Sequence, residues 1–328
     1  MKKAVNNKKT SLLTVLLIIA MVSWGISWTS AKIMGQYINP TTAIFTRFLI
    51  SAVTFLPIFP LLKKRLSLKH VSITTVISCA ITLALYNYCF FTGTKLGLAG
   101  AGGVLVTTTN PIITMIFMAV INKRKLSIKE IIGIFVGLTG GCLIIDIWRL
   151  GINQIFQSGN IYFILCATIW AGLTIFISKF VEKSQSINFT FWMYLGVAII
   201  MIPFLQFENI IKLLTFDFTF WIHLIIVSVG ALTFGTTTYF VASQKLGPEK
   251  SSSFIFTVPI SAMVTSMLLI DEVLTIRTFI GCSRHATTTS RMFCAAAIYI
   301  LIINVFTGES CHTCACTYCT IRRLVFYY

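Results

Sequence analysis

A single arginine inside an apolar run is the strongest candidate for ligand chemistry. Arg47 lies in the run 41–62, which contains no other charged residue. Removing a guanidinium from water is costly unless it gains partners, so a charge in such a place by default suggests a functional site. Arg47 either faces an interior cavity, where it pairs with an anionic ligand group or fixes a neighbouring helix, or it is a structural arginine whose charged end reaches water at the edge of the apolar layer.

A second polar group interrupts the next apolar run, 71–93. Tyr86, Asn87 and Tyr88 supply two phenols and an amide, which can hydrogen-bond a polar ligand without adding charge. Buried polar groups need partners, so this side of a helix is expected to face protein or water. Hydrogen bonds to a neighbouring helix are the competing interpretation for each of these residues.

Polar residues also stand beside a proline in the run 98–121. Thr108 and Asn110 precede Pro111, whose missing N–H leaves a helix carbonyl unpaired that nearby hydroxyl or amide groups can satisfy. The proline has a counterpart in the second half of the chain, Pro259. Both prolines are candidate gate hinges, and static packing kinks are the alternative.

The remaining candidates are aromatic and hydroxyl side chains from other apolar runs. Thr237 and Tyr239 belong to a polar patch, and Trp24 and Trp170 are candidate aromatic walls. Each aromatic residue could instead serve in packing or as an interfacial anchor. The predicted ligand-binding set is Trp24, Arg47, Tyr86, Asn87, Tyr88, Thr108, Asn110, Trp170, Thr237 and Tyr239.

The surroundings of the candidate motifs for catalysis and cofactor binding do not match those that such motifs require. The glycine-rich segment 97–103 lacks the strand-to-helix setting of a dinucleotide fold. No arrangement of nucleophile, base and orienting acid is apparent. The clearest carboxylates, Glu130, Asp146, Asp271 and Glu272, lie near the ends of apolar runs and not at a mid-helix position suited to a proton relay. We therefore predict no enzymatic activity, no cofactor and no metal.

Long apolar helices must position these residues. Hydrophobic residues make up 56% of the chain and charged residues 11%, against about 45–50% and about 25% in soluble domains. The apolar runs are near the ~20 residues that a helix needs to cross the hydrocarbon core. The predicted spans are 11–30, 41–62, 71–93, 98–121, 131–147, 160–180, 188–206, 219–242 and 250–270, with a tenth beginning near Thr278. The chain is thus predicted to be an all-α integral membrane protein.

Basic residues are distributed unevenly between the two sets of loops. They concentrate in alternate loops, at Lys2, Lys3, Lys8, Lys9, Lys63, Lys64, Arg65, Lys69, Lys123, Arg124, Lys125, Lys129, Lys179, Lys183, Lys245 and Lys250. Because such an excess marks the cytoplasmic side, the N-terminus is predicted to be cytoplasmic. Spans continue after the first run, which lacks a clear small-residue cleavage site, so a signal peptide is disfavoured. The net charge of +17 is mainly this topology signal, and no nucleic-acid partner is expected.

The two halves of the chain carry matching features in the same order. The matches are Lys95-Leu96-Gly97 with Lys245-Leu246-Gly247, Pro111 with Pro259, Leu126-Ser127-Ile128-Lys129 with Leu274-Thr275-Ile276-Arg277, Trp24 with Trp170, and Lys32 with Lys179. With an odd number of spans per half, the second copy is inserted upside down. Inverted repeats are a transporter architecture with the substrate site near the midplane, although duplication also occurs in some channels and enzymes.

These features together resemble the EamA family of the drug/metabolite transporter superfamily. The resemblance covers residues 10–281 and rests on Trp24-Gly25 followed by Lys32, Arg47-Phe48, the block 95–111, and the segment from 245–247 through Pro259 to Asp271-Glu272. It implies about ten helices in two inverted five-helix repeats, around a central cavity that opens alternately to each side. Members of this family move small metabolites, often outward, including amino acids and other polar compounds.

We therefore expect a multi-pass transporter of the inner or plasma membrane that exports a small polar metabolite by alternating access. Its partners would be this small-molecule substrate and the lipid bilayer. A membrane-embedded enzyme and a receptor-like binding protein are the alternatives from other classes. Gly133, Gly137 and Gly141 form a face of small residues, which predicts close packing of the fifth span on a neighbouring helix or in a homodimer.

The end of the second repeat departs from this pattern. The expected organisation is a basic tail (1–10), a first repeat (11–147), a loop (148–159), a second repeat (160–303) and a cysteine-rich tail (304–328). After Gly281, Arg284 and Arg291 make a poor span, since each central arginine costs about 2.5–3.5 kcal/mol. The tail has a C-x-x-C-x-C-x-x-C pattern that could bind zinc. Its compressed spacing favours altered coding sequence instead, such as a frameshift or an insertion.

Overall fold

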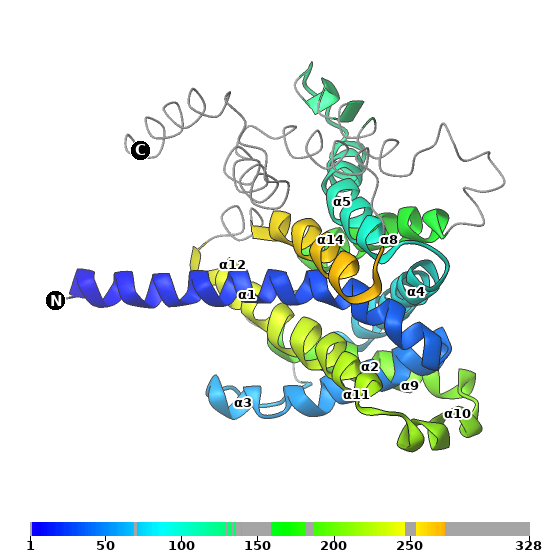
Figure 1. Cartoon of the computed structure of the whole chain (residues 1–328). Helices are drawn as coiled ribbons and strands as arrows, with labels where there is room; N and C mark the ends of the chain where they lie inside the picture. The colour runs from blue at the N-terminus through cyan, green and yellow to red at the C-terminus, as the bar shows by residue number, and fades with distance from the viewer. Residues whose placement is uncertain are drawn as a thin grey trace, which may run out of the picture.

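Every element that the computed structural model describes is a helix, as the composition predicts (Figure 1). The structure describes residues 2–68, 71–128, 130–132, 134–135, 139, 159–181, 186–246 and 254–272, and no strand occurs in these ranges. The α-helices are α1 (Lys2–Tyr37), α2 (Pro40–Phe55), α3 (Ile58–Leu61), α4 (Ile73–Leu96), α5 (Ala99–Ile121), α8 (Asn160–Phe180), α9 (Ser186–Met201), α10 (Phe207–Lys212), α11 (Phe218–Ile225), α12 (Thr237–Leu246) and α14 (Thr257–Ile270). Between them lie 3-10 turns at Ile202–Phe204, Leu213–Thr215 and Phe254–Phe256, and a π-helix, η4, at Ile226–Thr236.

Seven helices in the described part of the chain are long and apolar enough to cross a membrane. They are Leu12–Tyr37, Pro40–Leu61, Ile73–Leu96, Ala99–Ile121, Asn160–Ile177, Ile187–Phe204 and Phe218–Tyr239. A shorter apolar helix follows at Thr257–Ile270. The prediction of an all-helical, multi-pass membrane protein is therefore confirmed. Most of the predicted fifth span, including Gly133, Gly137 and Gly141, lies outside the described residues, as does the whole segment after Glu272 with its cysteine pattern.

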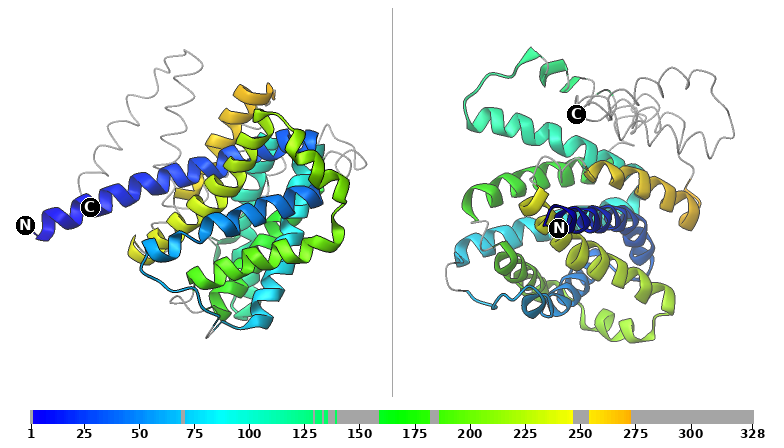
Figure 2. Two further views of the ribbon diagram at one scale, coloured as in Figure 1. Left: turned by 90° about the horizontal axis from the view of Figure 1, so that it is seen from below. Right: turned by 90° about the vertical axis from the view of Figure 1, so that its left-hand side faces the viewer.

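Helix α1 runs along the middle of the bundle, with the other helices on both sides of it (Figures 1 and 2). It packs against α14, η4, α4 and α11. Elsewhere, α2 packs against α9, and both α4 and α5 pack against α8. Helices from the first half of the chain are thus in contact mainly with helices from the second half. The two halves interleave and do not form separate bundles.

Caps at the turns between spans fix where each helix begins. Asn39 accepts a hydrogen bond from the N–H of Thr42 at 2.9 Å, and Pro40 is the first residue of α2. An asparagine N-cap followed by proline is a strong start signal. Because an α-helix rises 1.5 Å per residue, Arg47 lies about 10 Å along the helix from Pro40, the first residue of α2. This position is well inside the apolar layer.

Glycine allows α1 and α14 to approach closely. A Cβ added at Gly25 would overlap Ser261 Oγ and would lie 2.8 Å from the backbone nitrogen of Ala262. On α5, a Cβ added at Gly103 would lie 2.6 Å from the Cβ of Ala262. Small residues permit this backbone proximity in membrane helices. α1, α5 and α14 are therefore held together around Ala262.

The substitution Gly25→Ala tests this packing. The new methyl group has to displace the α14 backbone, and such overpacking typically costs about 1–3 kcal/mol. We expect Gly25→Ala to lower the midpoint of thermal unfolding in detergent by several degrees, measured by fluorescence-detected size-exclusion chromatography after heating. Gly172→Ala is the matched control, because a Cβ added there meets nothing within 4 Å. Equal midpoints for the two variants would contradict this account of the α1–α14 contact.

Candidate functional site

Arg47 is buried at the centre of the described helices and is held by groups from both halves of the chain. Arg47 is only 5% exposed. Nε donates to the carbonyl oxygen of Val227 at 3.1 Å, and Nη1 donates to Asn87 Oδ1 at 2.8 Å. The amide of Asn87 is itself fixed, since its Nδ2 donates to the carbonyl of Leu83 at 2.8 Å. Two of the three guanidinium nitrogens are therefore bonded to protein acceptors from α4 and η4.

Aromatic rings complete the surroundings of this cation. The guanidinium carbon lies 5.2 Å from the ring centre of Phe90 and 5.7 Å from that of Phe91. Both distances are within the range of cation–π attraction. The ion pairs within the described ranges are Lys32–Glu272 and Arg124–Glu130, and neither involves Arg47. Amide dipoles and ring faces thus stabilise a positive charge that has no acidic counter-ion among these residues.

The π-helix η4 supplies the acceptors on the second half of the chain. Ser51, one turn after Arg47, donates to the carbonyl of Ser228 at 3.0 Å and to that of Arg47 at 2.7 Å. A π-helical stretch widens the helix and is frequently found at functional sites. The Ser228 hydroxyl is fully buried and, within the described part of the chain, has no hydrogen-bond partner. A buried polar atom without a partner is unusual in a native interior.

Two of the predicted residues, Tyr86 and Trp170, are in contact near Arg47. The ring centres of Tyr86 on α4 and Trp170 on α8 are 4.9 Å apart. Tyr86 also stacks on Phe90, with ring centres 6.3 Å apart and an interplanar angle of 13°. Phe90 therefore connects the Tyr86–Trp170 pair to Arg47. We call Arg47, Asn87, Tyr86, Phe90, Trp170 and Ser228 the central cluster.

A second group of predicted residues lies where α1 packs against η4 and α12. Trp24 donates from Nε1 to the carbonyl of Ala231 at 2.7 Å, and its ring centre is 5.5 Å from that of Tyr239. Thr237, at the start of α12, has a buried hydroxyl without a hydrogen-bond partner among the described residues. The structure thus brings Trp24 and Tyr239 together, in contact with η4 and α12 instead of with Arg47.

Tyr88 is placed away from both groups. It is 43% exposed and follows Ile77, Ile81 and Leu85 along one exposed face of α4. Residues spaced by three or four positions share one side of a helix, and an apolar exposed side in a membrane protein is suited to lipid. The fold therefore separates Tyr88 from Tyr86 and Asn87, its neighbours in sequence.

The residues around the predicted hinges are engaged in helix contacts. Thr108 donates to the carbonyl of Val104 within α5 at 2.7 Å, and Asn110 reaches the carbonyl of Ala167 on α8 at 3.2 Å. Pro111 lies within α5, which continues to Ile121. Pro259 lies in the first turn of α14, where a missing N–H removes little helical bonding.

Sequence analysis did not identify Ser51, Phe90, Phe91 or Ser228. Ser51 follows Arg47 by one helical turn, and the phenylalanines follow Asn87 by one turn, so helical spacing from the predicted polar residues could have found three of the four. Nothing in the sequence marks Ser228, because its position depends on the π-helical winding of η4.

Asn87→Leu tests how far Arg47 depends on its amide partner. Removing the acceptor leaves a buried charged donor unsatisfied, which costs about 1–3 kcal/mol or more for a charged group. We expect a lower midpoint of thermal unfolding in detergent. Thr82→Val on the same helix is the control, because the Thr82 hydroxyl is exposed and bonds only its own helix at Ser78. If both variants unfold at the parental temperature, the bond to Asn87 does not stabilise Arg47.

The sequence is similar to transporters from bacteria and archaea. It is 23% identical over 247 residues to the uncharacterized transporter YyaM of Bacillus subtilis (strain 168), covering 74% of this chain and 81% of that protein. It is 22% identical over 272 residues to an uncharacterized transporter of Archaeoglobus fulgidus, covering 81% and 93%. It is 22% identical over 269 residues to a probable amino-acid metabolite efflux pump of Salmonella typhimurium (strain LT2), covering 79% and 87%.

Solved structures and family models agree with these relatives. One crystal structure, 16% identical in sequence, matches with a TM-score of 0.57 over 92% of this chain and 99% of that chain, so the fold is shared. The model of the EamA-like transporter family matches residues 12–146 and 157–283. This confirms the resemblance seen in the sequence, and it confirms a transporter over an enzyme. The chain belongs to the EamA-like transporter family.

Proposed function

We propose that this transporter moves a small polar metabolite that carries a carboxylate, such as an amino acid or a related compound, and that the central cluster binds it. The observation that carries the proposal is the buried Arg47, whose charge has no acidic partner among the described residues. A cation in the apolar layer is costly without a counter-ion. A substrate carboxylate would supply the missing charge.

The geometry of Arg47 suits this role. Nε and Nη1 donate to protein acceptors, and Nη2 has no described hydrogen bond. A guanidinium binds carboxylates through charge-assisted, planar hydrogen bonds. The substrate would take Nη2 and compete with Asn87 for Nη1, while the orphan hydroxyl of Ser228 and the rings of Tyr86 and Trp170 would contact the rest of the molecule.

The direction and the mechanism are proposed from the architecture and from one relative. The relative from Salmonella typhimurium is named a probable amino-acid metabolite efflux pump, which supports export of an amino-acid-like compound. Two family matches of similar length, one in each half, support two inverted five-helix repeats that work by alternating access. Basic loops support a cytoplasmic N-terminus, and we place the protein in the cell membrane.

Several finer assignments belong to the same proposal. Trp24, Thr237 and Tyr239 would contact substrate nearer the cytoplasmic end, and Thr108 and Asn110 would contact it from α5. Pro111 and Pro259 would serve as gate hinges. Tyr88 is the weakest member of the predicted set, because its ring is exposed on the apolar side of α4. Gly133, Gly137 and Gly141 would form the contact in a homodimer. The second family match ends at residue 283, which supports an altered coding sequence after that point.

Transport by reconstituted vesicles tests the role of Arg47 directly. We expect uptake of labelled amino acids, competed by other carboxylates and not by the corresponding amines or amides. Arg47→Lys keeps the charge but loses the planar fork, so KM should rise about ten-fold or more, which corresponds to ~1.4 kcal/mol of binding. The matched control is Arg124→Lys, on the loop after α5, where the side chain is 42% exposed.

Asn87→Asp provides an independent measurement on the same site. A carboxylate at position 87 would neutralise Arg47 from within the protein and compete with the substrate, so KM should rise while the variant stays folded. Unchanged KM values for both Arg47→Lys and Asn87→Asp, or equal competition by amines, would sink the carboxylate assignment. Saturable binding without uptake would instead identify a receptor-like protein.

A further inference from the structure

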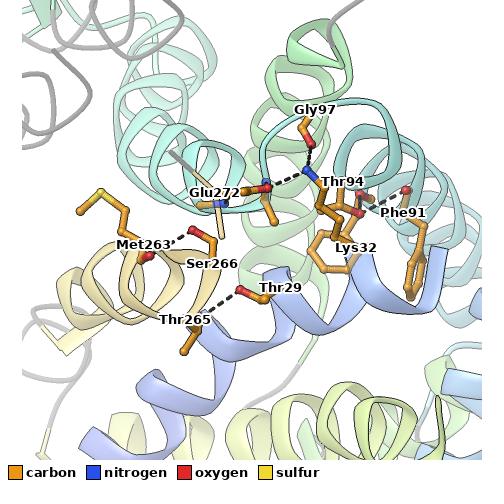
Figure 3. Close-up of polar contacts among 12 residues, drawn as sticks. Thr29, Lys32, Phe91, Thr94, Gly97, Met263, Thr265, Ser266 and Glu272 are labelled. Carbon is orange, nitrogen blue, oxygen red and sulfur yellow. Dashed lines mark hydrogen bonds and ion pairs between the residues drawn. The ribbon is translucent and has the colours of Figure 1, made fainter. Parts of the chain in front are cut away.

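One ion pair joins the two halves of the chain at the end of the bundle opposite the N-terminus. Lys32 Nζ, near the end of α1, lies 2.7 Å from Glu272 Oε1, just after α14 (Figure 3). The Glu272 side chain is 4% exposed and that of Lys32 is 24% exposed. Lys32 also donates to the carbonyl of Gly97, between α4 and α5, at 2.8 Å. With the N-terminus in the cytoplasm, this is the outer end.

The Glu272 carboxylate also caps α5. Oε1 accepts from the N–H of Ala99 at 2.8 Å, and Oε2 accepts from the N–H of Gly100 at 2.9 Å. These are the first residues of α5, and Leu98, which precedes them, has no side-chain oxygen to cap the helix. A carboxylate there satisfies free N–H groups and interacts favourably with the helix dipole. A residue of the second half therefore does the work of an N-cap for the first half.

The backbone at the end of α14 aims Glu272 at this position. Asp271 has a positive φ of 50°, and the N–H of Glu272 donates back to the carbonyl of Ser266 at 3.1 Å. Aspartate is one of the few residues that adopt the left-handed conformation readily. With this backbone conformation, the carboxylate of Glu272 points towards Lys32 and the start of α5.

The contact between α1 and α14 becomes more polar towards this end. Near the middle of α1, Gly25 packs on Ser261 without room for a side chain. One turn further out, the hydroxyls of Thr29 and Thr265 are 2.9 Å apart, and the ion pair closes the series. Water can replace hydroxyl and ionic contacts with little net loss, because both charges regain hydration when a pair opens.

The opposite end of α1 is closed by apolar packing. Leu17, Ala20 and Met21 are fully buried there against Ala242 and Val258. Opening at this end exposes hydrocarbon to water, which is unfavourable in proportion to the area exposed. The two ends of α1 are therefore closed by different interactions, and the outer end is the one that water can open.

We propose that Lys32, Glu272 and the first turn of α5 form the outer gate of the transport pathway. The proposal rests on the alternating-access function proposed above. In the conformation described, the gate is shut, since the carboxylate bridges α1 and α5. Opening to the outside separates Glu272 from Lys32 and from the amides of Ala99 and Gly100, and the α1–α14 contact then parts from Thr29 outwards.

Accessibility of a cysteine at Thr29 measures this opening without any substrate. Thr29 is fully buried, so Thr29→Cys should react slowly with a membrane-impermeant maleimide added outside intact cells. Adding Glu272→Gln or Lys32→Met should raise the rate by about five-fold or more, because a change of ~1 kcal/mol shifts a two-state population by that factor. Glu208→Gln, the same chemical change on an exposed carboxylate of α10, should leave the rate unchanged. Background labelling is subtracted with the chain that keeps Thr29.

Cross-linking provides a test that leaves the ion pair intact. The Thr29 and Thr265 hydroxyls are in contact, so cysteines at both positions can form a disulfide across the gate. Oxidation should abolish vesicle transport and a reductant should restore it. Unchanged labelling in folded Glu272→Gln and Lys32→Met, or full transport by the cross-linked chain, would overturn the gate. Faster labelling of both variants with no metabolite transported would support the gate and refute the proposed substrate class.

Discussion

A positive charge held inside an apolar layer is the constraint on which the centre of this protein depends. A guanidinium without partners would be costly in this layer. Arg47 is bonded to an amide of α4 and a carbonyl of η4, and two aromatic rings lie beside it. These partners come from two helices, α4 in the first half of the chain and η4 in the second, and Arg47 itself lies on α2. The position of each helix is therefore tied to the others through one guanidinium group.

The positive charge of Arg47 is stabilised by its neighbours but is not neutralised by an acidic side chain among the described residues. Dipoles and ring faces reduce the cost of the buried cation, but they do not neutralise it. In the proposed function, the carboxylate of the substrate would neutralise this remaining charge. Among the described residues, the acidic side chains that form ion pairs do so far along the chain from Arg47, at Glu130 and Glu272.

Much of the fold follows from the sequence, because hydrophobic run length fixes the spans in a membrane protein. The predicted runs at 41–62, 71–93 and 98–121 coincide closely with Pro40–Leu61, Ile73–Leu96 and Ala99–Ile121. The pairing of Arg47 with Asn87 could be anticipated as a need for a partner, though not as a specific contact. Two features could not be read from the sequence. The π-helical winding of η4 has no signal in the pattern of residue types, and the approach of Glu272 to α5 follows a left-handed residue, Asp271.

Because the two halves interleave, the contacts of Arg47 form in a fixed order during synthesis. The acceptor on Val227 is separated from Arg47 by 180 residues, whereas Asn87 is separated from it by 40. At a synthesis rate of about 5–20 residues per second, roughly 10 to 40 s pass between the appearance of Arg47 and that of Val227. During this interval the newly inserted first half carries its arginine with the amide partner but without η4. Until η4 is inserted, the Arg47 guanidinium in the bilayer therefore lacks the carbonyl of Val227 as an acceptor.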